Sequence, residues 1–147
     1  MKKILFVCTG NTCRSAMAAA MLNDIAVKDD LDILIDSAGV FAEIGGKATA
    51  EAVRVMKNRG IDLSTHRTKP LTDELMDMAD IILVMTAAHK ELIQNIAPEK
   101  VKTLMEYAGM DADISDPFGG DDEEYAETAD EIYTALCAIA KKLPSAK

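Results

Sequence analysis

The chain has 147 residues, of which 49% are hydrophobic and 28% are charged. This balance predicts one globular domain, residues 1–147, and excludes a disordered tail, a collagen-like repeat and a disulfide-rich miniprotein. The formal net charge of −9 argues against non-specific binding to nucleic acid or to an anionic membrane, because both need clustered Lys and Arg. A local anion site is compatible with this charge, since a helix N-terminus can bind phosphate inside an acidic protein.

The cysteine content and the N-terminal residues indicate the cellular compartment of the protein. Cys8, Cys13 and Cys137 lack the paired spacing of a secreted disulfide framework. The first apolar run ends after Val7 and polar residues 9–15 follow, which does not fit a signal peptide. No stretch approaches the roughly 20 apolar residues of a membrane span. We therefore expect a cytoplasmic monomer that binds neither membrane nor nucleic acid.

Strand and helix patterns alternate through the first half of the chain. Residues 4–7 predict a buried strand, and a helix is expected to begin near Ser15. Residues 32–36 predict a second strand, which precedes a helical stripe at 48–56 that stops at Gly60. The apolar positions of these two helices are Ala18, Met21, Leu22 and Ile25, followed by Ala48, Ala52, Val55 and Met56.

The alternation continues to the end of the chain. Residues 81–85 form the strongest strand pattern, and the helical stripe 88–96 is expected to end before Pro98. A weaker strand at 101–104 precedes a long helix at 125–140, striped by Tyr125, Ala129, Ile132, Tyr133, Leu136 and Ala140. This order predicts a three-layer α/β fold with a four-stranded parallel sheet and helices on both faces. Ligands of such folds bind beyond the carboxyl ends of the strands, which directs attention to the loop after the first strand.

That loop, residues 8–15, reads Cys-Thr-Gly-Asn-Thr-Cys-Arg-Ser and leads directly into the first helix. Backbone N–H groups in a tight loop before a helix N-terminus form a cradle for a tetrahedral oxyanion. Gly10 and Asn11 are residue types that tolerate a positive φ. The loop has neither the Gly-Lys-Ser/Thr of a Walker motif nor the glycines of a dinucleotide-binding fingerprint.

Three side chains of the loop fit attack on a bound phosphoryl group. The helix dipole, the loop N–H groups and Arg14 each stabilise the thiolate form of Cys8. The planar fork of Arg14 can hold two oxyanion oxygens. Ser15, at the predicted N-cap, can also donate its hydroxyl to the Cys8 sulfur, which makes Cys8 a better leaving group. Together they suit nucleophilic catalysis through a phosphocysteine.

The motif Cys-x5-Arg-Ser between a first strand and a first helix resembles the phosphate-binding loop of the low-molecular-weight protein tyrosine phosphatases. Ser37, His66 and Asp116-Pro117 fall where that family places its loop support and its general acid. The resemblance spans nearly the whole chain. It implies that phosphorylated proteins are the substrates and that no metal or cofactor takes part.

The resemblance also implies a role for each site residue. Cys8 attacks phosphorus in line, Arg14 binds the equatorial oxygens, and Asp116 first protonates the leaving group and then activates water. Asn11, Ser37 and His66 are expected to brace the loop, whereas His89 on its helix is expected to be structural. The residues implied in substrate binding are Thr9, Gly10, Asn11, Thr12, Cys13, Ser15 and Phe118. Taken one at a time, Cys8 could be an inert buried thiol, Asp116 a turn residue and His66 an exposed loop residue.

Two sequence features, and more weakly a third, favour phosphoarginine as the substrate. Thr12 stands where tyrosine phosphatases of the family usually carry a bulky aliphatic residue, and it resembles the protein-arginine-phosphatase branch. Only Phe118 follows Asp116-Pro117, where tyrosine-directed relatives commonly carry a pair of aromatics. No Lys or Arg lies between Lys102 and Lys141. An acidic rim would favour a cationic guanidinium group, although acids are also common at solvated helix N-termini.

Two departures from the family pattern have consequences. Ala16 stands where Pro often follows Arg-Ser, and because Ala is a good helix former no loss of activity is implied. Cys13 is a second thiol in the loop. Peroxide could join it to Cys8 in a reversible disulfide, or Cys13 could be a passive thiol.

Three rival functions remain. The first is a protein tyrosine phosphatase of the same family. The second is an arsenate reductase, which needs further cysteines as a relay, but residues 83–90 contain none and Cys137 lies on the last predicted helix. The third is a non-catalytic binder of phosphorylated residues, which would need neither a thiolate nor an acid.

Overall fold

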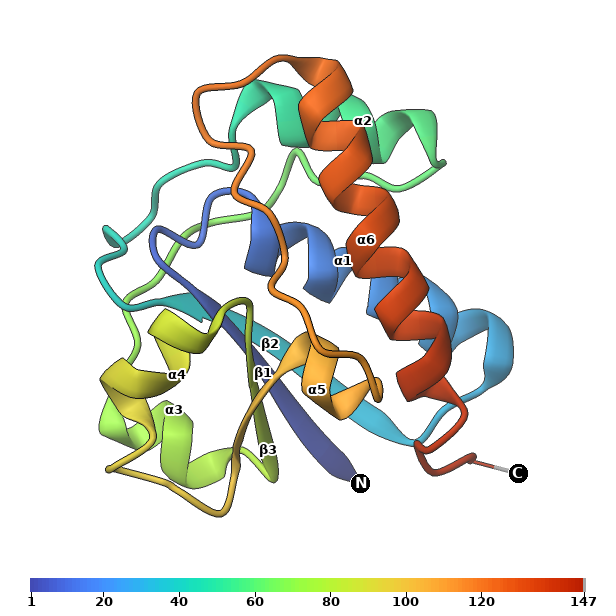
Figure 1. The fold of residues 1–147 in the computed structure, drawn as a ribbon. Helices are drawn as coiled ribbons and strands as arrows, with labels where there is room; N and C mark the ends of the chain where they lie inside the picture. The colour runs from blue at the N-terminus through green and yellow to red at the C-terminus, as the bar shows by residue number, and fades with distance from the viewer. Residues whose placement is uncertain (147) are drawn as a thin grey trace.

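The computed structural model describes residues 1–146 and contains alternating strands and helices (Figure 1). The elements in chain order are β1 (Lys2–Cys8), α1 (Arg14–Asp29), β2 (Ile33–Gly39), α2 (Ala50–Asn58), α3 (Asp73–Met78), β3 (Ile81–Val84), α4 (Ala87–Ile93), β4 (Val101–Thr103), α5 (Leu104–Tyr107) and α6 (Asp122–Ala140).

The strands form a parallel four-stranded sheet of order β2-β1-β3-β4 within the described part of the chain. Chain order reverses at β1, because β2 pairs with one of its edges and β3 with the other. Cys8 at the end of β1 is in register with Gly39, and Val7 is in register with Val84. The loop after β1 therefore leaves the sheet at the switch in strand order, where open α/β folds bind ligands.

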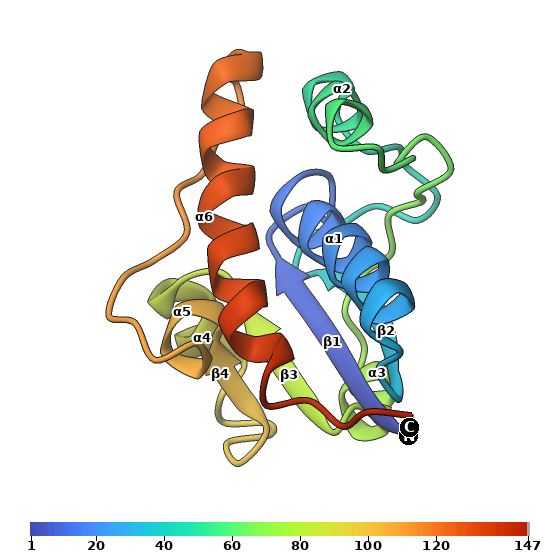
Figure 2. The same ribbon diagram turned by 90° about the vertical axis from the view of Figure 1, so that its right-hand side faces the viewer.

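Alternate residues of β1 supply the two layers of core. Ile4 and Phe6 face α1, α2 and α6, whereas Leu5 and Val7 face α3 and α4. Figures 1 and 2 show these two groups of helices on opposite sides of the sheet. Because both faces are covered, consecutive residues of the strand are apolar, and the predicted three-layer fold is confirmed.

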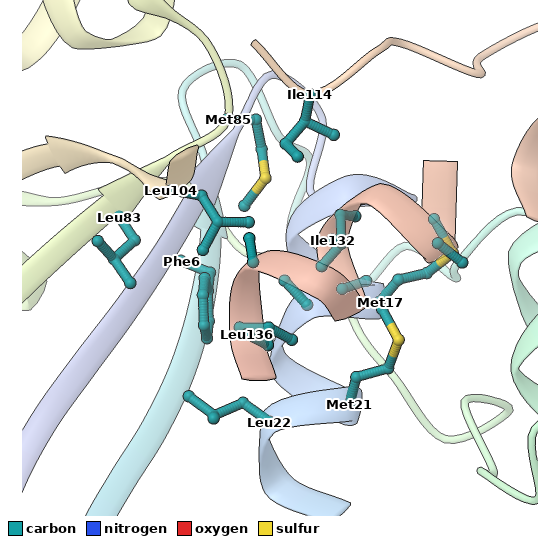
Figure 3. Close-up of a cluster of buried hydrophobic side chains, with 14 of the residues drawn as sticks. Phe6, Met17, Met21, Leu22, Leu83, Met85, Leu104, Ile114, Ile132 and Leu136 are labelled. Carbon is teal, nitrogen blue, oxygen red and sulfur yellow. The ribbon is translucent and has the colours of Figure 1, made fainter. Parts of the chain in front are cut away.

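The larger core layer lies between the sheet and the α1–α6 helix pair. In Figure 3, Phe6 of β1 lies near Leu136 of α6 and near Leu22 of α1, and Leu104 and Leu83 lie on its other side. Each of these side chains has less than 1% of its surface exposed. Burial of a side chain of this size stabilises a fold by about 1.5–3 kcal/mol, so this layer holds α1, and with it the loop, firmly on β1.

Two short helices differ from the sequence-based expectation. α3 has six residues and α5 four, and both begin after a threonine whose side chain accepts a backbone N–H: Thr72 for α3 and Thr103 for α5. Glu106 completes a capping box with Thr103. Leu104, predicted as the end of a strand, is therefore the first residue of α5. A helix of one turn is set by its cap and shows no apolar period.

Helix boundaries account for the other differences. α4 ends at Ile93 instead of near Pro98, and two apolar positions of the predicted stripe 88–96, Leu92 and Ile96, are 57% and 58% exposed. α2 begins at Ala50 because the Thr49 side chain caps it, so Ala48 precedes the helix. Tyr133 belongs to α6 but is 40% exposed.

Candidate active site

The loop between β1 and α1 is shaped by a close approach to the end of β2. Asn11 takes a left-handed conformation, with φ of 58°. A Cβ atom on Gly39 would lie 2.7 Å from the Thr9 carbonyl oxygen and 2.8 Å from the Asn11 nitrogen, so only glycine fits there. The Cys8 and Thr9 carbonyls accept from the N–H groups of Val40 and Phe41, which continues the strand pairing into the loop.

Asn11 is also the centre of a buried hydrogen-bond network. Its Nδ2 donates to Ser15 Oγ (2.8 Å) and to Ser37 Oγ (3.0 Å), and its Oδ1 accepts from the Lys69 N–H (3.2 Å). His66 Nε2 lies 2.7 Å from the Asn11 carbonyl and must donate, because a carbonyl only accepts. The side chains of Asn11, Ser37 and His66 are therefore placed together around the loop, and their contacts offset the cost of the left-handed residue.

Helix α1 begins two residues earlier than a Ser15 N-cap predicts. Its N-cap is Cys13, no side chain caps it, and Ser15 is its second residue, so the expectation of a Ser15 N-cap is wrong. The loop backbone before Arg14 turns directly into the helix, which puts the positive end of the helix dipole at the loop, where it favours an anion. The Ser15 hydroxyl instead lies 2.9 Å from Cys8 Sγ, the contact that the sequence predicted.

Arg14 is a buried guanidinium with unused hydrogen-bonding capacity. Its exposed fraction is 4%. Nη1 donates to the Ile114 carbonyl (3.2 Å), and Nη2 lies 3.6 Å from Asp116 Oδ2. The buried Nε has no hydrogen-bond partner among the described residues. Because an unpaired buried donor is costly, an oxyanion that accepts from this edge of Arg14 would be strongly favoured.

Asp116 reaches the same place from the segment between α5 and α6. Its side chain is 58% exposed, and its Oδ1 accepts from the Phe118 N–H (3.1 Å). A pocket of about 210 Å³ separates this segment from the loop, and it is lined by Cys8, Thr9, Gly10, Thr12, Cys13, Arg14, Asp116 and Phe118. A larger hollow of about 410 Å³ lies beside α2, but its lining includes no cysteine, histidine or arginine. The smaller pocket is therefore the candidate active site.

The two thiols in the pocket differ in environment. Cys8 and Cys13 are both free and both buried. Burial, helped by the negative charge of a neighbouring Cys8 thiolate, raises the pKa of Cys13 to about 11. Cys13 is therefore a neutral thiol at physiological pH. Cys137 lies on α6, beside Asp24 and Lys28 of α1, and does not line the pocket.

The carboxylates of the acidic stretch that follows Lys102 are less available to a cationic substrate than the composition of the stretch suggested. Several of its carboxylates pair with cations of other elements: Arg54 with Asp122, Arg59 with Asp130, and Lys90 with Glu106. Others are used within the protein, since Asp113 accepts from the Ala87 N–H and Glu131 from the Ser115 N–H. Asp116 is the carboxylate of this stretch that lines the pocket.

His89 contacts the loop, which the sequence did not reveal. Its Nε2 lies 2.9 Å from Thr9 Oγ1, and the residue is 6% exposed. Burial, followed by the positive charge of Arg14, lowers the pKa of His89. The available signal was its position three residues after the Thr86 cap, in the segment that follows the strand beside β1.

Within residues 1–146, no group of three or more His, Cys, Asp or Glu residues is placed to hold a metal ion. In the same range, no helix combines the length and apolarity needed to cross a membrane.

A pocket lined by a buried thiol and by a buried arginine whose Nε has no partner among the described residues is the arrangement of a cysteine-dependent phosphatase. Residues 3–147 match the family model described as low molecular weight phosphotyrosine protein phosphatase, and the chain belongs to this family.

Proteins of known sequence and proteins of known structure resemble the chain over almost its full length. It is 46% identical over 144 residues to a protein-arginine-phosphatase of Bacillus subtilis and 45% identical over 145 residues to one of Geobacillus stearothermophilus, in each case covering at least 95% of both chains. A low molecular weight protein tyrosine phosphatase from T. tengcongensis superposes with a TM-score of 0.93 at 41% identity, covering 97% of this chain and 100% of that one. A cysteine-to-serine mutant of the YwlE arginine phosphatase with a phosphorylated active site serine has a TM-score of 0.91 at 45% identity, covering 95% and 94%.

Alkylation should distinguish the two thiols of the pocket, Cys8 and Cys13. At pH 8, a pKa of about 11 leaves only about one Cys13 in a thousand ionised. Iodoacetamide attacks thiolates, so peptide mass spectrometry after brief treatment is expected to find Cys8 modified and Cys13 unmodified, with Cys13 labelling rising only at alkaline pH. A Cys13→Ser variant, which leaves the Cys8 peptide intact, is the control. Equal labelling of Cys8 and Cys13 at pH 8 would contradict the assignment.

Proposed function

We propose that this protein hydrolyses phosphoarginine side chains of proteins through a phosphocysteine formed on Cys8. The observation that carries the proposal is the pocket in which Cys8, Arg14 and Asp116 meet, with the buried Nε of Arg14 left unpartnered. The two arginine phosphatases with about 46% and 45% identity over nearly the whole chain support the choice of substrate.

In the first step, the Cys8 thiolate attacks phosphorus and the bond from phosphorus to the guanidino nitrogen breaks. Arg14 and the loop N–H groups hold the phosphoryl oxygens as charge develops on them. Asp116, in its protonated form, gives its proton to the departing nitrogen, so arginine leaves as a neutral or cationic side chain and the carboxylate is left behind. Asp116 is 58% exposed and lines the pocket, which supports its role as an acid near the opening through which the leaving group departs.

In the second step, water attacks the phosphocysteine and the bond from phosphorus to sulfur breaks. The Asp116 carboxylate accepts a proton from that water, which restores the acid for the next cycle. The Ser15 hydroxyl, 2.9 Å from the sulfur, donates to the departing Cys8 thiolate. Inorganic phosphate then leaves the pocket.

Substrate choice is proposed to depend on two residues at the rim. Thr12 is half-buried and lines the pocket, and its carbonyl is tied to the Thr49 N–H (3.0 Å), which fixes its position. Its small polar side chain suits a guanidinium group better than a phenol ring. Asp116 can pair with the cationic group while it donates its proton.

Phosphotyrosine hydrolysis is the second candidate. Phe118 is 70% exposed and lines the pocket, so it offers an apolar surface to an aromatic ring. Relatives named as low molecular weight protein-tyrosine-phosphatases, such as PtpB of Staphylococcus epidermidis at 38% identity, support this alternative. An arsenate reductase relay needs another thiol beyond Cys8 and Cys13, and Cys137, on the side of α6 near Asp24 and Lys28 of α1, does not line the pocket, which speaks against that function.

The same pocket supports a redox switch. Cys8 and Cys13 line it together and both are free thiols. Peroxide would oxidise Cys8 to a sulfenic acid with loss of hydroxide, and the Cys13 sulfur would then displace water to form a disulfide. The switch fits a cytoplasmic enzyme that is kept reduced, and we propose that the enzyme acts as a monomer.

Cys8→Ser should lower turnover of a phosphoarginine peptide by about 10⁴-fold or more, because the nucleophile is lost. The cradle remains, so binding of inorganic phosphate, measured by calorimetry, should change by less than about threefold. The matched control is Cys137→Ser on α6, which should leave kcat/KM unchanged. Substantial turnover by Cys8→Ser would remove Cys8 as the nucleophile.

Thr12→Ile should shift preference toward phosphotyrosine. We expect the ratio of kcat/KM for phosphoarginine over phosphotyrosine peptides to fall by about 10- to 100-fold, as a pocket change of this size permits. Thr134→Ile, on the exposed side of α6, should leave the ratio unchanged. An unaltered ratio in Thr12→Ile would refute the role of Thr12.

Peroxide should inactivate the reduced enzyme, and dithiothreitol should restore its activity. In Cys13→Ser the disulfide cannot form, so we expect recovery to fall as Cys8 oxidises further to irreversible acids. Mass spectrometry of the oxidised protein should show a Cys8–Cys13 linkage. Equal recovery by both proteins would exclude Cys13 as the partner.

A further inference from the structure

The ring of His89 is buried against the phosphate loop, yet the proposed reaction gives it no part. Its position is fixed by α4, whose cap residue Thr86 accepts from the His89 N–H (3.2 Å). From there Nε2 reaches Thr9 Oγ1 at 2.9 Å, whereas Nδ1 is buried and has no hydrogen-bond partner among the described residues.

The surroundings of His89 determine its charge. Burial and the positive charge of Arg14 both lower the pKa of His89, while the carboxylates Asp116 and Asp113 act in the opposite direction with less effect. The ring is therefore neutral at physiological pH and carries a single N–H.

The contact with Thr9 indicates which nitrogen carries that proton. A proton on Nδ1 would leave a buried N–H without an acceptor, which native structures rarely tolerate. A proton on Nε2 leaves only an unused lone pair at Nδ1 and lets Nε2 donate to Thr9. The Nε2–H form therefore fits this site better.

Donation by His89 sets the direction of the Thr9 hydroxyl. A hydroxyl has one proton and two lone pairs, and one lone pair is taken by the histidine N–H. The hydroxyl proton must then point to another acceptor. Thr9 is exposed and lines the pocket next to Cys8, where a bound phosphoryl group would bring oxygen atoms.

We propose that His89 is a positioning residue that holds the Thr9 hydroxyl as a hydrogen-bond donor to a phosphoryl oxygen in the pocket. The inference rests on the proposed function in so far as it needs a phosphoryl group above Cys8. It adds a donor from the α4 side of the site to the cradle formed by the loop and Arg14, and it explains why a neutral histidine is buried at this point.

The tautomer can be measured directly in the wild-type protein. The chain has two histidines, so nitrogen-15 NMR of the imidazole rings, assigned with a His89→Gln variant, reports each nitrogen separately. We expect His89 at neutral pH to have a protonated Nε2 and a bare Nδ1. The opposite tautomer, or a doubly protonated ring, would overturn the inference.

Binding of inorganic phosphate tests the role of the hydrogen bond. Calorimetry should show phosphate affinity about fivefold weaker in both His89→Leu and Thr9→Val, the size of one lost hydrogen bond. The double variant should be no weaker than either single one, because both changes remove the same donor. His89→Gln keeps an N–H with similar reach and should restore affinity to within about twofold. Additive losses, or unchanged affinity in His89→Leu, would refute the proposal.

Two comparisons distinguish a failure of the proposed role of His89 from destabilisation of the fold and from a failure of the proposed function. If His89→Leu has a lower melting temperature than the wild type and Thr9→Val does not, the loss of phosphate affinity in His89→Leu could come from destabilisation. The phosphate affinity of Thr9→Val then decides: an unchanged value refutes the proposal. If the wild type binds phosphate but hydrolyses neither phosphoarginine nor phosphotyrosine, the proposed function fails while the role of His89 is still tested. If phosphate does not bind to the wild type, both fail.

Discussion

Asn11 holds a left-handed turn in the middle of the phosphate loop, and the rest of the site is arranged around it. Its fully buried side chain bonds to Ser15, Ser37 and the Lys69 N–H, and its carbonyl accepts from His66. These partners come from α1, from β2 and from the segment after α2. Because the loop is fixed by three separate parts of the chain, its N–H groups are oriented before any anion arrives, which is the basis of electrostatic preorganisation.

The same loop gives its two thiols different chemistry. Cys8 has a hydroxyl donor at 2.9 Å in Ser15, whereas burial keeps Cys13 protonated. Arg14 lies beside both and spends only part of its hydrogen-bonding capacity on Ile114 and Asp116. Cys8 is thus suited to nucleophilic attack, whereas Cys13 stays a neutral thiol.

Much of this was predictable from the sequence, because local patterns determine it. The consecutive apolar residues of β1 predict a strand covered on both faces, and the spacing from Cys8 to Arg14 predicts the oxyanion site. The short helices α3 and α5 were missed because caps, and not apolar periods, set them. Ser15 was predicted as the N-cap because serine is a residue type favoured there. The helix starts instead from the backbone of the loop at Cys13, and a start that depends on backbone geometry cannot be predicted from residue types. The contact of His89 with Thr9 joins residues 80 positions apart, and only the pairing of β1 with β3 brings them together.

The absence of a side chain at Gly39 has a consequence for how this catalytic loop could be reused. The loop backbone lies so close to β2 that one additional carbon atom would collide with it. Residues at the rim, such as Thr12 and Phe118, face the opening and are not part of that contact. Transplanting the eight-residue motif onto another parallel sheet would therefore also require a glycine at the end of the neighbouring strand. The loop and the two strands that flank it would have to be transferred together.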